Sequence, residues 1–243
     1  MAAPIPRYTV QVLLPYVQAL DPDVVHEQLL RWRDDIERIG SSRVDQFGFA
    51  IPTQDLPLLV HIFHAGPDAY GAQLDDALAW SPSWPERHAA VAGCTTSIVV
   101  SMIAHRAVNH ATLLLAFLAV LDTVLGCVDD LRTAVLHWLP AQRVLPFAQY
   151  RMLRMELGPC GPAVNVRIAP ISHTDVVADT VGLTGLGLPD LQAITPARDP
   201  AELTGKLVKL ARSMFVGDPL ECTWTEQSAI VLPSRDALTV HLD

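Results

Sequence analysis

Histidine is the side chain that most readily binds metals or transfers protons near neutral pH, and this chain has nine of them. His105 and His110 flank the start of an apolar segment, where they could converge in a loop. A zinc site would require at least one more ligand; the candidates are His88, His173 and Asp122. Nothing in their spacing demands such a site. We therefore expect no metal and no cofactor, and we retain His105 and His110 as candidate binding residues.

The sequence offers little for nucleophilic or acid–base catalysis. It lacks the Gly-x-Ser-x-Gly pattern that exposes a serine nucleophile. Cys160, in G-P-C-G-P, has the surroundings of an exposed turn, but no basic residue stands beside it to lower the pKa of its thiol. Asp122 interrupts an apolar run, where a buried carboxylate would need a partner such as Arg106 or Arg132. We expect Asp122 to form a structural ion pair or to touch solvent at a helix edge, and we expect no catalytic residue.

Three glycines punctuate the stretch T-V-G-L-T-G-L-G-L-P-D-L-Q at residues 180–192. Glycine suits positions of positive φ and positions where another group approaches closely. The spacing fits neither a dinucleotide-binding fingerprint nor a nucleotide phosphate loop. The segment is therefore a bend in a strand or, alternatively, the wall of a ligand pocket. The candidate binding residues of this segment are Thr180, Gly182, Gly185, Gly187 and Asp190.

The pattern Thr-x-Gly-Leu-x-x-x-Gly-x-Pro-Asp-Leu over residues 180–191 resembles the motif of an uncharacterised bacterial family, a domain of unknown function. Looser landmarks that also resemble this family are Leu-Leu-Pro at 13–15, Gly66-Pro67, Trp80, Trp84 and a helix after Pro200. The resemblance covers nearly the whole chain. It implies a soluble bacterial α+β domain and no catalytic residue.

Composition and charge indicate which classes of molecule the protein is expected to bind. Half of the 243 residues are hydrophobic and 18% are charged, as in a chain that buries a sizeable core. The formal net charge is −9, and the two lysines, Lys206 and Lys209, form no basic stripe. Nucleic acid, which binds clustered Lys and Arg, is therefore not expected as a partner, whereas a protein with a basic surface is favoured. The four cysteines are scattered, which is typical of reduced thiols in a cytoplasmic protein.

The apolar run at residues 111–128 raises the question of a membrane span. A spanning helix needs about 20 predominantly apolar residues, and Asp122 places a carboxylate within this shorter run. We therefore expect a buried central helix, and no membrane as a partner.

The order of elements predicts an α+β protein with an antiparallel or mixed sheet and helices. We expect strands at residues 8–16, 47–51, 58–63, 96–103, 133–138, 164–171, 221–225 and 229–232. We expect helices at residues 24–39, 73–78, 85–91, 109–128 and 199–215. Residues 150–157 suit a strand or a short helix. The chain would form one compact domain over 1–243, or two ferredoxin-like β-α-β halves, 1–92 and 93–243, packed as one unit.

These observations favour a non-catalytic cytoplasmic protein that binds another protein. Its concrete form would be an immunity-like or chaperone-like partner of a secreted bacterial toxin, with acidic groups facing a basic surface. The alternative is a small-molecule enzyme or sensor with a pocket near residues 180–192. A third option is a domain that forms a homo-oligomer through an exposed apolar face.

Overall fold

The computed structural model describes residues 7–43, 45–54, 57–81, 84–104, 110–196, 200–217, 223–228 and 236–241. The chain divides into two compact units, residues 1–152 and 153–243, so the expected boundary after residue 92 is wrong. The reason is that β5 (Thr96–Ile103) lies between β4 (Leu58–Ala65) and β1 (Arg7–Leu14) in one sheet. The strands of the two expected halves are thus direct neighbours.

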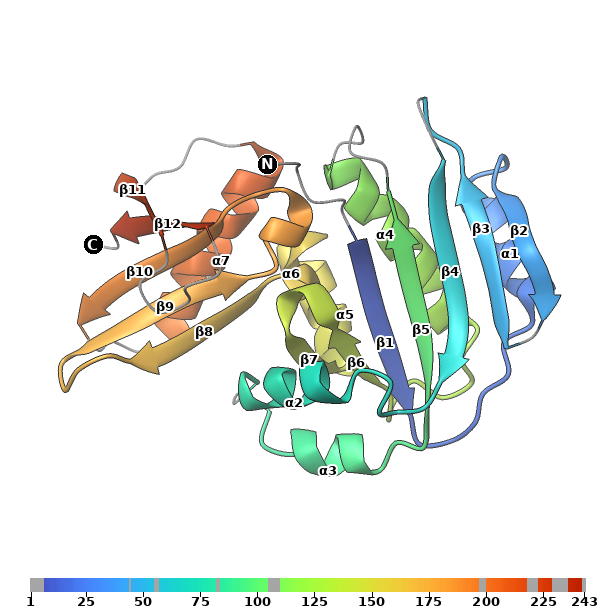
Figure 1. The fold of residues 1–243 in the computed structure, drawn as a ribbon, viewed down its shortest axis with the longest axis horizontal. Helices are drawn as coiled ribbons and strands as arrows, with labels where there is room; N and C mark the ends of the chain where they lie inside the picture. The colour runs from blue at the N-terminus through green and yellow to red at the C-terminus, as the bar shows by residue number, and fades with distance from the viewer. Residues whose placement is uncertain are drawn as a thin grey trace. The chain divides into compact units, whose positions relative to one another are not determined.

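One antiparallel sheet forms the centre of the first unit, and it confirms the α+β class. Its strand order is β2-β3-β4-β5-β1-β6-β7 (Figure 1). Its other strands are β2 (Glu37–Arg43), β3 (Gln46–Ile51), β6 (Val135–Trp138) and β7 (Arg143–Pro146). Val10 in the central strand β1 pairs with Val100 on one side and with Trp138 on the other. These residues therefore point to the same face of the sheet.

Helices α1 (Pro22–Trp32) and α4 (His110–Gly126) cover that face (Figure 1). The Tyr8 ring stacks on Phe117 of α4 at 5.4 Å between centroids, and Phe117 meets Trp138 edge-on at 5.6 Å. Most of the apolar side chains of α4 are buried, as the sequence predicted. Among the described residues, no helix combines the length and the apolar character that a membrane crossing requires. Asp122 is exposed at the edge of α4 and accepts a hydrogen bond from the Tyr150 hydroxyl at 2.5 Å.

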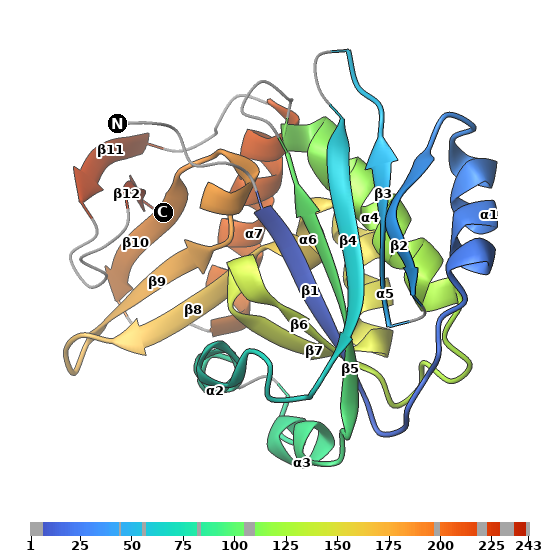
Figure 2. The same cartoon turned by 45° about the vertical axis from the view of Figure 1, so that its right-hand side comes forward.

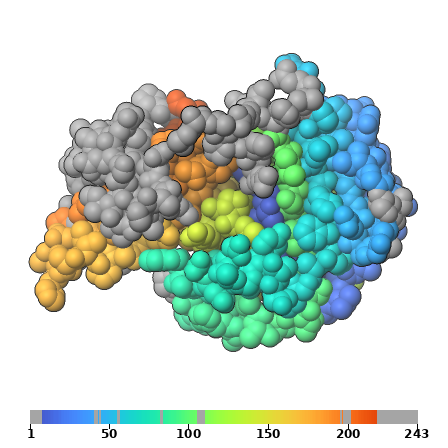
Figure 3. All heavy atoms as spheres, viewed as in Figure 1, coloured from blue at the N-terminus to red at the C-terminus, as the bar shows by residue number. Residues whose placement is uncertain are grey.

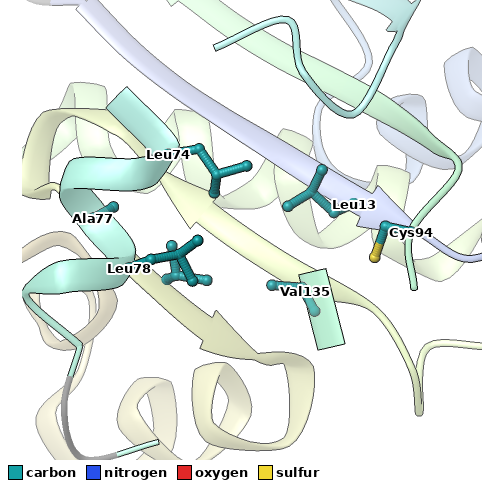
Figure 4. Packing of buried hydrophobic residues seen from close by; sticks show 7 residues of the cluster. Leu13, Leu74, Ala77, Leu78, Cys94 and Val135 are labelled. Carbon is teal, nitrogen blue, oxygen red and sulfur yellow. The ribbon is translucent and has the colours of Figure 1, made fainter. Parts of the chain in front are cut away.

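The opposite face is partly covered by α2 (Gly71–Ala79), with α3 (Arg87–Ala92) beside it. Leu74, Ala77 and Leu78 of α2 point toward Leu13 and Val135 of the sheet (Figure 4). This packing buries one side of α2 and leaves its other side in solvent.

The helix expected at residues 24–39 ends early. Arg33 has extended backbone angles, φ −157° and ψ 120°, and β2 starts four residues later. Glu37 and Ile39 then pair with Ala50 and Gly48 of β3. Sheet pairing thus overrides the helical spacing of the apolar residues. Residues 150–157, which suited either element, are helical within α5 (Phe147–Leu157), whereas the strand expected at 229–232 lies outside the described residues.

A mixed five-stranded sheet forms the second unit, in the order β11-β12-β10-β9-β8. Its elements are α6 (Cys160–Ala163), β8 (Asn165–Pro170), β9 (Asp175–Val181), β10 (Asp190–Pro196), α7 (Pro200–Val216), β11 (Thr223–Ser228) and β12 (Asp236–His241). Among the described strand pairs of this sheet, β10 and β12 are parallel and the other pairs are antiparallel. Helix α7 lies against β8 and β9 (Figure 2), and it buries Leu203, Leu207 and Ala211.

Candidate functional site

The glycine-rich segment is the connection between β9 and β10, and two polar side chains hold it from inside. The Thr180 hydroxyl accepts a hydrogen bond from the Leu191 backbone N–H at 2.7 Å and donates to Asp190 Oδ1 at 3.3 Å. The same Asp190 oxygen accepts the Leu183 backbone N–H at 3.1 Å. Both side chains are buried. The polar groups with which this segment was expected to bind a ligand therefore serve the turn itself.

The glycines explain how the chain turns within so few residues. Gly182 and Gly187 have φ values of 115° and 73°, which side-chain-bearing residues rarely adopt. Gly187 ends a short 3-10 turn, Thr184–Leu186, and Gly185 lies inside it, donating its N–H to the Gly182 carbonyl at 3.1 Å. The structure thus shows the bend that the glycine spacing predicted.

The structure describes only one of the two candidate histidines, His110. His105 lies outside the described residues, so its convergence with His110 stays a prediction. His110 begins α4 half-buried, and its buried Nδ1 has no hydrogen-bond partner in the described part of the chain. Burial lowers the pKa of His110. Within the described ranges, no three His, Cys, Asp or Glu side chains are grouped to hold a metal ion.

Two cysteines of the described ranges, Cys94 and Cys160, are buried. Cys160, expected in an exposed turn, is buried at 2% exposure because it lies in the short helix α6, which packs against α7. Gly161 packs so closely that a Cβ there would lie 2.5 Å from the Leu153 carbonyl oxygen. Burial raises the pKa of Cys160, and that of Cys94 to about 11. Both thiols therefore stay protonated near neutral pH.

A buried polar cluster in the first unit was not anticipated from the sequence. Gln11 Nε2 donates to the Pro67 carbonyl and to Ser97 Oγ, both at 3.1 Å. Gln11 Oε1 lies 3.3 Å from His137 Nδ1, which therefore carries the proton. Gln11, Ser97 and His137 are fully buried, and His137 Nε2 has no partner among the described residues. Burial lowers the pKa of His137 to about 4, so the imidazole is neutral at neutral pH.

Four exposed acidic residues lie in α2 and in the turns that precede α2 and α3, and together we name them the acidic face. It consists of the exposed residues Asp68, Asp75, Asp76 and Glu86. No Lys or Arg occurs between Arg43 and Arg87 in the sequence, and none of the four carboxylates forms an ion pair with a described residue. The segment of α2 and α3, in blue-green, lies on the molecular surface in Figure 3.

Within the described residues, several other carboxylates of the first unit, unlike the four of the acidic face, are paired with an arginine nearby. Elsewhere, Arg33, Arg43 and Arg132 form two-pronged pairs with carboxylates two residues away, namely Asp35, Asp45 and Asp130. Arg87 stands next to the acidic face, but its guanidinium donates to the carbonyls of Leu78 at 2.6 Å and Trp84 at 3.1 Å. It is thereby held at the end of α2, away from salt-bridge geometry with the four carboxylates.

A cavity of about 660 Å³ opens on the first unit, between the loop after α4 and the start of α5. Its lining residues are Val128, Asp129, Asp130, Leu131, Arg132, Phe147, Ala148 and Arg151. None of them belongs to the glycine-rich segment, where the sequence analysis placed its alternative pocket.

Comparisons of the chain with protein-family models, with curated proteins and with solved structures gave no match. The resemblance of residues 180–191 to a domain family therefore stays a prediction.

Proposed function

We propose that this protein is a non-catalytic cytoplasmic binding protein whose first unit binds a basic surface of another protein through the acidic face. One observation carries the proposal: the four carboxylates of the acidic face are exposed and form no ion pair with a described residue, whereas the neighbouring Arg87 is engaged by backbone carbonyls. Uncompensated charge of one sign steers an oppositely charged partner and sets its orientation.

The surroundings of the acidic face also suit protein recognition. Tyr70 and Trp84 are half-exposed beside it, and Trp84 packs against the buried apolar cluster that α2 forms with Leu13 of the sheet. Aromatic side chains of this kind are enriched at protein interfaces, where a fixed ring supplies contact area. The concrete form that we propose is an immunity-like or chaperone-like protein that covers the basic surface of a secreted bacterial toxin.

The test is affinity capture from a lysate of the source organism with three matched baits. These are the tagged full-length protein, a D75N/D76N variant, and a D34N/E37Q variant as control. Asp34 and Glu37 are likewise exposed and without an ion pair among the described residues, so the control removes the same charge from another surface. Retained proteins are identified and quantified by mass spectrometry at low and at high salt.

We expect one stoichiometric protein with a basic surface, retained by the wild type and the control. Its retention should fall several-fold with D75N/D76N and with added salt, because exposed charges are screened within about 10 Å at 0.1 M salt. Equal retention by all three baits would refute the acidic face as the binding surface. Absence of any stoichiometric partner would refute the proposed function.

A further inference from the structure

The cavity at the start of α5 has walls that hydrogen bonds hold in place. The Tyr16 hydroxyl donates to the Asp130 carbonyl at 2.7 Å and accepts the Asp130 N–H at 3.0 Å. Gln18 Oε1 accepts the Asp129 N–H at 3.4 Å. These contacts cross more than 110 residues of sequence and tie the cavity loop to the segment after β1. The loop is therefore shaped before any ligand arrives, which lowers the entropy lost on binding.

The opposite wall is an aromatic ring that is also fixed in position. Phe147 stacks on Tyr150, with 6.2 Å between centroids, and Tyr150 is bound to Asp122 of α4. Val128 and Leu131 complete an apolar lining around the ring. The cavity is open to solvent on one side, its walls are largely apolar, and its volume of about 660 Å³ is large enough for a small molecule.

Two of the four charged groups in the cavity are compensated by each other and two are not. Asp130 and Arg132 form a two-pronged ion pair with both N···O distances at 3.0 Å. The side chains of Asp129 and Arg151 form no hydrogen bond or ion pair with a described residue. The guanidinium of Arg151 lies 6.0 Å from the centre of the Phe147 ring, which keeps it beside the apolar wall. The cavity therefore presents one open carboxylate and one open guanidinium around an apolar surface.

From this charge pattern we propose that the cavity binds a small zwitterion with an apolar body, namely a free α-amino acid with an apolar side chain. Arg151 binds the ligand carboxylate, since a guanidinium matches that group in geometry and charge. Asp129 accepts hydrogen bonds from the ligand ammonium group. The apolar side chain of the ligand packs against Phe147, Val128 and Leu131. This site is distinct from the acidic face and would act independently of it.

Isothermal titration of the full-length protein tests this proposal with L-phenylalanine and L-leucine as probes. N-acetyl-L-phenylalanine lacks the ammonium charge, and L-phenylalaninamide lacks the carboxylate, so the two compounds examine the two contacts separately. The protein variants are D129N and R151Q, with R31Q as a control that removes one exposed positive charge from α1. Circular dichroism checks that each variant keeps its fold.

We expect saturable binding of at least one amino acid with a Kd in the range of about 1 mM or tighter. Both modified compounds should bind about tenfold more weakly, because each leaves a charged group of the protein without its partner. D129N should weaken binding of the amino acid but not of the N-acetyl compound, and R151Q should weaken binding of the amino acid but not of the amide. The proposal is overturned if neither amino acid saturates the protein by about 10 mM, or if D129N and R151Q bind as R31Q does. Neither result bears on partner capture by the acidic face, so the two proposals fail separately.

Discussion

The buried His137 should make the stability of the fold depend on pH in a defined window. In the fold its imidazole is neutral, with Nδ1 donating to Gln11 and Nε2 without a partner among the described residues. A second proton on Nε2 would place a charge in a site with no exposure to solvent. Burial therefore lowers the pKa of His137 from 6.5 to about 4.

The sign follows from which state binds more protons. Between pH 6.5 and pH 4 the unfolded chain protonates His137 and the folded chain does not, so stability falls as the pH falls. The contribution is fully present above pH 6.5, the pKa of the unfolded side chain, and is lost through this window. At 1.36 kcal/mol for each pKa unit, the loss reaches about 2 to 3 kcal/mol between pH 7.5 and pH 4.5.

Urea unfolding at pH 7.5 and at pH 4.5 measures this loss in the wild type and in an H137Q variant. Gln keeps a hydrogen-bonding side chain beside Gln11 but does not titrate, so the variant should lose about 2 to 3 kcal/mol less than the wild type over this range. Carboxylates titrate in both proteins and cancel in the comparison. An H88Q variant is the control, because His88 is an exposed histidine of α3. Equal pH dependence in wild type and H137Q, or an NMR titration that shows His137 charged at pH 6, would refute the reasoning.

Three further predictions concern the turn and the thiols. T180V should lower the free energy of unfolding by about 2 kcal/mol in chemical denaturation, because the buried Leu191 N–H loses its acceptor. The control is T184V in the same turn, and an equal loss in both variants would contradict the role of Thr180. G187A should cost about 1 kcal/mol in the same assay, since φ is 73° there, and an unchanged midpoint would contradict this. Cys94 and Cys160, both buried with raised pKa values, should react with a thiol reagent at pH 8 only after unfolding; rapid labelling of either in the native protein would show that burial does not protect it.

Elements with strong local patterns could be predicted from the sequence. The run T-S-I-V-V-S-M-I forms β5 with the expected bounds, Thr96–Ile103, because β-branched and apolar residues suit a buried strand. The glycines and Asp190 of the β9–β10 turn were also open to prediction, since positive φ and side-chain capping are local effects.

Features that depend on distant pairing could not be predicted in this way. Residues 33–39 continue a helical spacing, yet Glu37 and Ile39 belong to β2 because β3 offers them backbone partners. Gln11 contacts Ser97, which lies 86 positions later in the sequence, and His137, which lies 126 positions later. Gln11 could have been recognised as unusual because it is a polar residue in an apolar strand. Its partners, Ser97 and His137, could not be identified from the sequence.

The distribution of charge over the folded surface could not be predicted from the sequence either, and the proposed function depends on it. The sequence spreads its acidic residues along the chain, so a count of charges suggests an even surface. In the fold, arginines at two-residue spacing neutralise Asp35, Asp45 and Asp130, whereas backbone carbonyls engage Arg87 at the end of α2. The carboxylates of the acidic face therefore remain unpaired among the described residues, because the neighbouring Arg87 binds backbone carbonyls instead. We therefore expect R87Q to remove the hydrogen bonds at the end of α2 and to lower thermal stability. Because Arg87 pairs with none of the four carboxylates, the substitution should not increase partner capture by the acidic face. Increased capture by R87Q would instead show that Arg87 screens the acidic face in the native protein.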